Sequence, residues 1–593
     1  MRILFLYSDI GTYLPRHYQH GIGFLSAVLK AAGHETGLIY LQETPEPETL
    51  ISDVDRFRPD IVAISAGTNQ FHHLRRFAEW IRKAHPDLPV ICGGVHATHA
   101  PEEVIRSPAI DYICRGESEE AMLEFTDALL HDRDPGGISN LWLKRKGKII
   151  RNPVRPLQEN LDALPFADRE IFDHESLLAQ DYYKLSLLVA RGCPFRCTYC
   201  ANYGKRELYR GKGKFVRLRS VNNILAEIRD ILSRYRVDKL DFNDDIFTLN
   251  RAWTEEFCDA YSGEFSIPFD TNVHVETLDR AIIEKLKAAG CDMIRVGVES
   301  GSERVRRDIL NRPMSREKII QVFRDADEAG LRTWSFNMIG LPDETPEDAE
   351  LTYRLNEQLW PDHMQVSVFN PYPGTELYSI CKEKGYLSAR EVDGYFIPES
   401  VLEMPQFTRE QIYEWHRKLI HLSDVSKNHK RLRRELGERG RQIDLIEALD
   451  GAEIETPVPA YVGEDYFTIG EDVRRVLLEH PPSCVRFKLR VPGQAKLRSG
   501  IAMHPGVLEK PGGEGVIFTI RAGLRIRGMK TVFEQTLDAK RARADRGWHD
   551  FEIPLEHLSG KKVLLEFITN TRDPEHTDFN TAGWSNPIIL GEA

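Results

Sequence analysis

The sequence predicts an α/β protein that ends in an antiparallel β-sandwich, and three patterns support this prediction. Short apolar runs alternate with amphipathic helical segments over residues 1–135, and the same alternation returns over residues 181–390. This alternation predicts parallel sheets whose strands are joined by helical crossovers. Over residues 456–593 the apolar residues instead alternate with polar ones between glycine, proline and aspartate turns, which is typical of antiparallel strands.

Length and composition narrow the class of protein. The chain has 593 residues, which is more than one hydrophobic core supports. Its formal charge of -12 argues against a nucleic-acid partner and favours small-molecule or protein partners. The N-terminal apolar run is too short for a signal peptide, and no run approaches the roughly 18 apolar residues of a membrane span, so we expect a cytoplasmic protein. Nine cysteines, three of them clustered, favour a metal site over a disulfide framework.

Residues 1–135 should form an open, doubly wound parallel sheet. The expected strands are 3–7, 37–41, 61–65, 90–92 and 111–114, and the crossover helices include 23–32, 74–84 and 119–130. Such sheets bind ligands at the carboxyl ends of their strands, where glycine lets a cofactor approach the backbone. We expect glycine-containing loops there at 21–23, 65–68 and 93–98. A nucleotide, a flavin or no ligand would each fit these loops, although the absence of G-x-G-x-x-G counts against NAD.

The remaining chain divides into four segments. Residues 136–180 contain several prolines, and we interpret them as a linker with one hairpin at 141–151. Residues 181–390 repeat the α/β alternation about six times, which predicts a partial TIM-like (βα)6 barrel with its site at the carboxyl ends of the strands. A charged helical segment at 391–455 should lead to the sandwich at 456–593. The expected barrel strands are 185–190, 239–242, 269–272, 293–298, 332–338 and 364–369.

Three cysteines in the loop after the first barrel strand are the strongest chemical signal. Cys193, Cys197 and Cys200 have the spacing C-x3-C-x2-C. Three thiolates are one ligand short of a closed zinc site or a fully ligated cubane cluster, and no fourth cysteine or histidine lies nearby at ligand spacing. On a four-iron cluster they would leave one iron open. A zinc site and chance clustering are the alternatives.

The cysteine spacing resembles the cluster motif of radical S-adenosylmethionine (SAM) enzymes. The resemblance implies that Cys193, Cys197 and Cys200 hold a [4Fe-4S] cluster and that SAM is chelated at its open iron. It also implies reductive cleavage of SAM to a 5'-deoxyadenosyl radical. The electron would come from an external donor of the flavodoxin or ferredoxin type.

With the glycine loops upstream, residues 1–390 resemble the cobalamin-binding radical SAM family, in which a Rossmann-like corrinoid domain precedes the barrel. The D-x-H-x-x-G motif that places a histidine on cobalt in many corrinoid mutases and methyltransferases is missing here, because His17 and His20 are wrongly spaced. We expect a lower cobalt face without that histidine, and we expect His96 to be a hydrogen-bonding loop residue and not a ligand of cobalt. The resemblance implies cobalamin contacts at Ser65, Gly67, Thr68, Gly93, Gly94, His96, Thr98, Gly116 and Glu117.

Polar residues at the ends of the barrel strands match the SAM-contacting segments of the same family. Asn243, Asp244 and Asp245 match the segment that contacts the SAM amino group, although two adjacent carboxylates could instead cap the next helix. Glu299 and Ser300 match the ribose-contacting stretch. Gly340 lies in a further strand-end segment that matches the family.

The expected function is methylation of an unactivated carbon or phosphorus centre in a small-molecule or natural-product substrate. A radical cyclase or rearrangement enzyme of the same fold is one alternative, and a non-catalytic corrinoid- or glycan-binding protein is another. No catalytic acid or base is assigned, because a radical mechanism needs few titratable protein groups. In the sandwich, an exposed Trp548 or Trp584 would favour glycan binding, whereas burial is the default for large aromatic side chains.

Overall fold

A computed structural model describes residues 1–12, 16–388, 390, 397–436, 440–469, 472–509, 515–524, 528–571 and 581–592. The chain forms two compact units. The first comprises Met1–Leu359 and Gln365–His416, and the second comprises Trp360–Met364 and Arg417–Ala593. Among the helices described, none combines the length and the hydrophobicity that crossing a bilayer requires.

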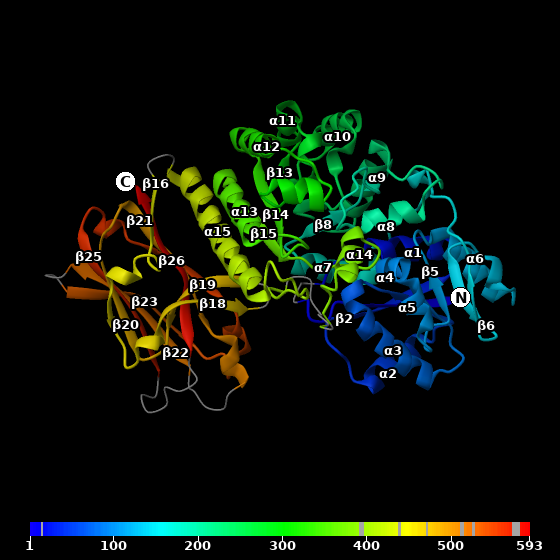
Figure 1. Cartoon of the computed structure of the whole chain (residues 1–593), viewed down its shortest axis with the longest axis horizontal. Helices are drawn as coiled ribbons and strands as arrows, with labels where there is room; N and C mark the ends of the chain where they lie inside the picture. Colours follow the sequence, from blue (N-terminus) through cyan, green and yellow to red (C-terminus); the bar gives the residue numbers. More distant parts are fainter. Residues whose placement is uncertain are drawn as a thin grey trace. The chain divides into compact units, whose positions relative to one another are not determined.

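The first unit begins with a seven-stranded sheet in the order β2-β1-β3-β4-β5-β6-β7. Figure 1 draws this part of the chain in blue and cyan. Strands β1 to β5 are parallel, as predicted, whereas β6 and β7 form an antiparallel hairpin that pairs with β5. The hairpin that we assigned to a linker therefore extends the sheet, because its residues Leu141, Trp142 and Leu143 are buried in the core. The strands are β1 (Arg2–Ser8), β2 (Glu35–Leu41), β3 (Ile61–Ser65), β4 (Val90–Gly93), β5 (Tyr112–Cys114), β6 (Leu141–Arg145) and β7 (Lys148–Arg151).

Helices cover both faces of this sheet, which makes it doubly wound. Alternate residues of β1 face opposite sides: Leu4 packs in the core that contains α2 and α3, and Phe5 packs in the core that contains α1 and α6. The strand order 2-1-3-4-5 places the expected ligand crevice at the carboxyl ends of the central strands. The helices are α1 (His20–Ala31), α2 (Pro47–Phe57), α3 (Phe71–Ala84) and α6 (Glu119–Leu130).

Two of the expected glycine loops are helical instead. Gly21 and Gly23 lie in the first turn of α1, whose next residue, Phe24, is buried in the core. The stretch after β4 forms the short helix α4 (Gly94–His99), which is followed by α5 (Pro101–Arg106). Ala97 and Thr98 are buried on α4, so packing against the sheet favours a helical turn over an open loop.

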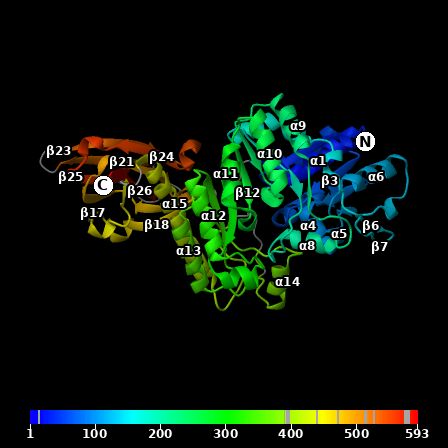
Figure 2. The ribbon, with the colours of Figure 1, turned by 90° about the horizontal axis from the view of Figure 1, so that it is seen from above.

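The second sheet of this unit is the expected partial barrel. Its six strands lie in the order β15-β14-β13-β12-β11-β8, which follows the chain, and the pairs from β8 to β14 are parallel. Helices α9 to α12 pack on the outer face of these strands, where they share one core (Figure 2). The strands are β8 (Lys184–Leu187), β11 (Lys239–Phe242), β12 (Phe269–Val273), β13 (Cys291–Glu299), β14 (Arg332–Ile339) and β15 (His363–Val368), and the helices are α9 (Val221–Leu232), α10 (Arg251–Glu264), α11 (Arg280–Ala288) and α12 (Arg316–Glu328).

The segment predicted as helical at 391–455 is only partly so. Helix α15 (Arg409–Leu436) accounts for its centre, but β16 (Gly440–Asp444) pairs with β26 (Ala582–Glu592), and β17 (Glu453–Glu455) pairs with β20 (Ser483–Arg490). Residues 391–396 and 437–439 of the expected segment lie outside the described residues. The correction has a packing cause, because Ile443 of β16 packs against the core of the second unit.

The second unit contains two antiparallel sheets, as predicted. One has the order β18-β19-β26-β21-β24, and the other has the order β17-β20-β25-β22-β23. Trp584 is fully buried in their shared core, where its ring meets Phe518 and Phe567 edge to face, so it offers no surface for a sugar. The remaining strands are β18 (Val462–Ile469), β19 (Asp472–Glu479), β21 (Gly493–Met503), β22 (Val516–Leu524), β23 (Gly528–Leu537), β24 (His549–Pro554) and β25 (Lys562–Thr571).

Candidate functional site

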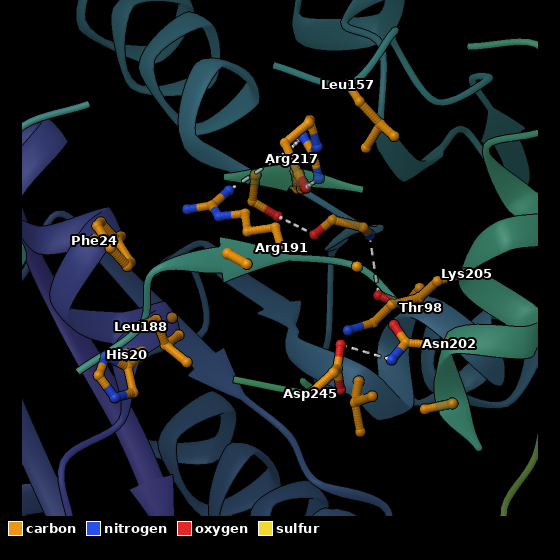
Figure 3. A pocket seen from close by; sticks show the side chains of 18 of the residues that line it. His20, Phe24, Thr98, Leu157, Leu188, Arg191, Asn202, Lys205, Arg217 and Asp245 are labelled. Carbon is orange, nitrogen blue, oxygen red and sulfur yellow. Dashed lines mark hydrogen bonds and ion pairs between the residues drawn. The ribbon is translucent and has the colours of Figure 1, made fainter. Parts of the chain in front are cut away.

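A cavity of about 490 Å³ lies between the first sheet and the barrel of the same unit (Figure 3). One wall follows the carboxyl ends of β3, β4 and β5, and includes the first turn of α1. The other wall follows β8 and β11, and includes helix α8 (Ala201–Leu208) after the cysteine loop. Both α/β sheets thus present the ends at which such sheets bind ligands. The predicted site residues that line it are Ser65, Gly94, Thr98, Gly116, Glu117, Cys200, Asn243, Asp244 and Asp245.

The three motif cysteines lie in the loop between β9 (Ala190–Arg191) and α8. Cys200 lines the cavity, Cys193 is half-buried and Cys197 is buried. Burial raises the pKa of Cys193 to about 12 and that of Cys200 to about 11, so neither is an activated nucleophile without a metal. In the described chain, the one group of three metal-ligating side chains whose atoms all lie within 4.8 Å of one another is His421, Asp444 and Glu447.

This spacing bears on the choice between zinc and a cluster. Sulfur atoms that share one tetrahedral zinc ion, each about 2.3 Å from it, lie about 3.8 Å from one another, which is within the 4.8 Å limit. The sulfurs of Cys193, Cys197 and Cys200 are not grouped in this way in the described chain. A donor set of three thiols on one loop fits a cluster, which spreads its ligands over several irons.

A segment far along the chain holds the cysteine loop in place. Thr198 donates its backbone N–H to Leu310 O at 3.1 Å and its hydroxyl to Ile309 O at 2.6 Å. Arg312 donates from Nε and Nη2 to Gly297 O at 3.2 and 3.0 Å, and its Nη1 lies 3.5 Å from Cys197 Sγ. No local sequence pattern identifies this arginine, because it lies more than a hundred residues from the motif. It supplies the kind of N–H···S contact that tunes a sulfur-ligated metal site.

Glu299 contacts the cysteine loop and does not line the cavity. Its carboxylate accepts a hydrogen bond from the Tyr199 hydroxyl at 2.8 Å, and burial raises the pKa of both groups. Glu299 has a φ of 67°, a conformation that is rare for a residue with a side chain and is often stored at functional sites. Ser300 is buried and packs beside Thr352, and Gly340 packs under Ile412, so these two predicted SAM contacts lie away from the cavity wall.

The three residues after β11 have three different environments. Asp244 is buried, and its carboxylate accepts the backbone N–H groups of Val189 at 2.9 Å and Ala190 at 2.6 Å. Asp244 therefore braces the chain that leads to the cysteines and does not cap the next helix. Burial raises its pKa to about 7. Asn243 and Asp245 are exposed on the cavity wall, where Asp245 accepts a hydrogen bond from Asn202 at 2.8 Å.

Two glycines on the opposite wall allow close packing within the protein at the edge of the cavity. Gly94 has a φ of 90°, and a Cβ there would lie 2.7 Å from the backbone nitrogen of Ala66. Gly116 has a φ of 73°, and a Cβ there would lie 2.0 Å from the Tyr209 hydroxyl. Thr98 fixes this wall, because its hydroxyl accepts the Gly116 N–H at 3.0 Å. A wall of bare backbone and small side chains fits close approach of a flat macrocycle such as a corrin.

Other predicted corrin contacts do not reach the cavity. His96 is buried on α4 with Nε2 3.6 Å from the Glu103 carboxylate, so it pairs from a helix and not from a loop. Gly67, Thr68 and Gly93 are also absent from the lining. His20, which the motif spacing excludes as a cobalt ligand, does line the cavity. His17 has its Nδ1 3.2 Å from the Asp9 carboxylate.

An ion-pair cluster joins the two walls. Arg217 of β10 (Arg217–Leu218) donates to the Glu117 carboxylate at 2.9 and 2.5 Å, and Arg191 donates to Glu119 at 2.6 Å. The Tyr209 hydroxyl accepts the backbone N–H of Glu117 at 2.8 Å. The carboxylate of Glu117 therefore faces the barrel arginines, and sequence reasoning missed this because each pair joins residues far apart in the chain.

Comparisons with known proteins agree with this division of the first unit. The model of the Radical SAM superfamily matches residues 187–355, and the model of the B12 binding domain matches residues 9–126. An uncharacterized methyltransferase from Pyrococcus horikoshii is 29% identical, over 67% of this chain and 86% of the relative. The anaerobic magnesium-protoporphyrin IX monomethyl ester cyclase of Rubrivivax gelatinosus is 24% identical, over 65% and 70%. Cytidylyl-2-hydroxyethylphosphonate methyltransferase from Streptomyces wedmorensis is 23% identical, over 64% and 80%.

A solved structure shares the fold. The radical SAM methyltransferase TsrM from Kitasatospora setae, with cobalamin and a [4Fe-4S] cluster bound, superposes with a TM-score of 0.54 at 18% identity, over 71% of this chain and 85% of that one. A radical SAM domain implies a [4Fe-4S] cluster and SAM, and a B12-binding domain implies cobalamin. This chain, with its B12-binding domain followed by a radical SAM half-barrel, belongs to the cobalamin-dependent radical SAM enzymes.

Proposed function

We propose that the protein transfers a methyl group from SAM to an unactivated carbon or phosphorus centre of a small-molecule substrate. The observation that carries this proposal is the single cavity, which is lined both by backbone of the B12-binding domain and by Cys200 with the strand-end residues of the barrel. Two reactive groups that open into one cavity can act on one bound molecule. Two of the relatives named above are methyltransferases, which supports the choice of reaction.

The residues of this chain have separable roles in the proposal. When bound, the cluster and SAM supply a 5'-deoxyadenosyl radical, and cobalamin supplies a methyl group. Cys193, Cys197 and Cys200 would hold the cluster, and Arg312 would donate to the Cys197 sulfur. Asn243 would contact the SAM amino group.

Three further sets of residues complete this assignment. Asp245 would also contact the SAM amino group, and Gly94 and Gly116 would let the corrin approach the backbone. Glu299 would act on the SAM site through Tyr199, because its carboxylate is engaged by that hydroxyl. An external one-electron donor of the flavodoxin or ferredoxin class would supply the electron.

The test is an anaerobic reconstitution of the full chain. Iron, sulfide and cobalt are quantified per chain, and the products of SAM are then measured under reducing conditions. Methyl transfer predicts that 5'-deoxyadenosine and S-adenosylhomocysteine form together during turnover. Formation of 5'-deoxyadenosine without S-adenosylhomocysteine would contradict methyl transfer.

A radical cyclase is the second candidate, because one of the relatives is named as a cyclase. It predicts SAM cleavage without S-adenosylhomocysteine, so the same measurement separates the two reactions. A fully loaded protein that never cleaves SAM would support a corrinoid-binding role instead. The variant Cys197→Ala is the control for both, since it should lose cluster iron while its glycine-lined wall is unchanged.

A further inference from the structure

One hydrogen-bonded chain crosses from the B12-binding domain to the strand-end residues of the barrel. His20, the first residue of α1, has Nε2 2.8 Å from the hydroxyl of Ser186 on β8. The same hydroxyl accepts a hydrogen bond from Asn243 Nδ2 at 2.9 Å. Figure 3 shows His20 at the edge of the cavity, on a different element from the barrel residues. His20 and Asn243 both line that cavity, and Ser186 lies between them in the chain of bonds.

The neighbours of Asn243 fix which end of its amide faces which way. Its Nδ2 also lies 3.2 Å from the Asp241 carboxylate, which is paired with Arg295 and lies 3.1 Å from Lys184 Nζ. A carboxylate that meets two cations offers its oxygens as hydrogen-bond acceptors, so the amide end that faces Asp241 is the NH2 group. Both hydrogens of that group are then used, one on Asp241 and one on Ser186.

The direction of the remaining bonds follows from that orientation. Ser186 Oγ accepts from Asn243 on one lone pair, and its own hydrogen can be donated to His20 Nε2. In this arrangement Nε2 of a neutral His20 is the acceptor, and its ring proton is on Nδ1. Burial, with Arg169 and Arg219 nearby, lowers the pKa of His20 well below its usual value, in agreement with this state. The oxygen of the Asn243 amide has no partner among the described residues, and it is the atom left to accept from a ligand in the cavity.

We propose that His20 of the B12-binding domain is a positioning residue for the SAM site, because through Ser186 it holds Asn243 with its amide oxygen available to the SAM amino group. The inference rests on the proposed contact between Asn243 and SAM. If His20 is removed, the Ser186 hydroxyl loses its acceptor and can rotate. Asp241 alone then holds the NH2 group of Asn243, so the side chain can shift and its oxygen no longer has a fixed position toward the SAM amino group. SAM binding should then depend on a residue from outside the radical SAM domain.

The experiment measures SAM binding to the full-length, cluster-reconstituted protein under anaerobic conditions, without substrate. His20→Ala and Ser186→Ala should each weaken SAM binding about three- to tenfold, the range expected for one buried neutral hydrogen bond. The double variant should be no weaker than either single variant, since both act on one chain of bonds. His20→Gln should restore most of the affinity, because its side-chain oxygen can accept from Ser186. His85→Ala, which alters a histidine of the same domain paired with Asp55, is the matched control.

A second ligand separates positioning from general damage to the fold. The probe is the SAM analogue in which hydrogen replaces the amino group. His20→Ala should leave its affinity within about twofold of the wild-type value, since the analogue has no amino group for Asn243 to receive. The electron paramagnetic resonance spectrum of the reduced cluster, recorded with and without SAM, reports the same binding independently.

The outcomes distinguish this inference from the proposed function. Equal weakening of SAM and the analogue, or unchanged SAM affinity in His20→Ala and Ser186→Ala, would overturn the role of His20 and leave the proposed function intact. Unchanged SAM affinity in Asn243→Ala would remove the SAM contact itself, and the positioning role would fall with it. Loss of SAM affinity in Asn243→Ala would support the proposed SAM contact. If His20→Ala and Ser186→Ala also weaken binding of SAM but not of the analogue, the positioning role of His20 is supported as well.

Discussion

Asp244 should stabilise the segment that leads into the cysteine loop, because its carboxylate is the acceptor for two backbone N–H groups there. Its buried carboxylate accepts the N–H groups of Val189 and Ala190. Asp244→Ala would leave both amides buried without an acceptor, at a cost of about 1–3 kcal/mol each. The local free energy of opening at these residues should therefore fall by at least about 2 kcal/mol, or roughly 30-fold in protection from hydrogen exchange.

Hydrogen exchange of the peptide that contains Val189 and Ala190, followed by mass spectrometry, measures this opening directly. Asp245→Ala is the matched control, because the adjacent carboxylate is exposed and accepts from Asn202 alone. Faster exchange in Asp244→Ala but not in Asp245→Ala is the expected result. Equal exchange in the two variants would refute the bracing role and return Asp244 to the set of free ligands.

The same carboxyl predicts a pH dependence. Burial raises the pKa of Asp244 from 3.8 to about 7, so between these values the folded chain keeps a proton that the unfolded chain releases. Stability from this group therefore falls as the pH rises, by roughly 2 kcal/mol between about pH 5.5 and 7.5, and levels off above about pH 8. Asp244→Asn should lack this slope, after the intrinsic exchange rate at each pH is taken into account.

Three further predictions concern other parts of the chain. Arg312→Met removes the donor to Cys197 Sγ and should lower the reduction potential of the cluster and weaken its retention about 10–100-fold, measured by redox titration and by iron release to a chelator. Gly116→Ala places a Cβ against the Tyr209 hydroxyl and should lower stability by about 1–3 kcal/mol and reduce cobalt content, with partial rescue by Tyr209→Phe. Burial raises the pKa of Glu479 to about 8, so the wild-type second unit should lose stability between about pH 5 and 8 in fluorescence-monitored unfolding, and Glu479→Gln should not.

The sequence predicted the sheets well because buried parallel strands are short, continuous apolar runs. The strand expected at 239–242 coincides with β11, and the one at 269–272 lies within β12. Strands that form only by pairing with a distant segment could not be predicted, because their own residues show no apolar pattern. β16 has the polar sequence Gly-Arg-Gln-Ile-Asp and is a strand because β26, far along the chain, provides its partner. The helix after β4 was missed because six residues are too few to show a helical period.

The site was predicted by residue type but not by orientation. Asp244 and Asp245 are chemically identical, and the sequence assigned both to SAM. Both lie in the bend after β11, where Asp244 is buried and Asp245 is exposed. Asp244 is the buried one because its carboxylate meets the backbone N–H groups of Val189 and Ala190, which no local pattern reveals. Arg312 and Arg191 were missed for the same reason, since their partners are distant in the sequence.

The loop after β5 lines the cavity with one residue and binds the barrel domain with the next. Gly116 offers bare backbone to the cavity, while the next residue, Glu117, binds Arg217 of the barrel domain through its carboxylate. A loop that an ion pair holds at one residue cannot move freely at the neighbouring residue, so docking of the two domains should set the position of Gly116 in the cavity wall. His20 imposes the reverse dependence, because a residue of the B12-binding domain contacts Ser186, which is hydrogen-bonded to Asn243. Each wall of the cavity is therefore held partly by the other domain, and ligands of the cavity should bind most tightly when both domains are docked.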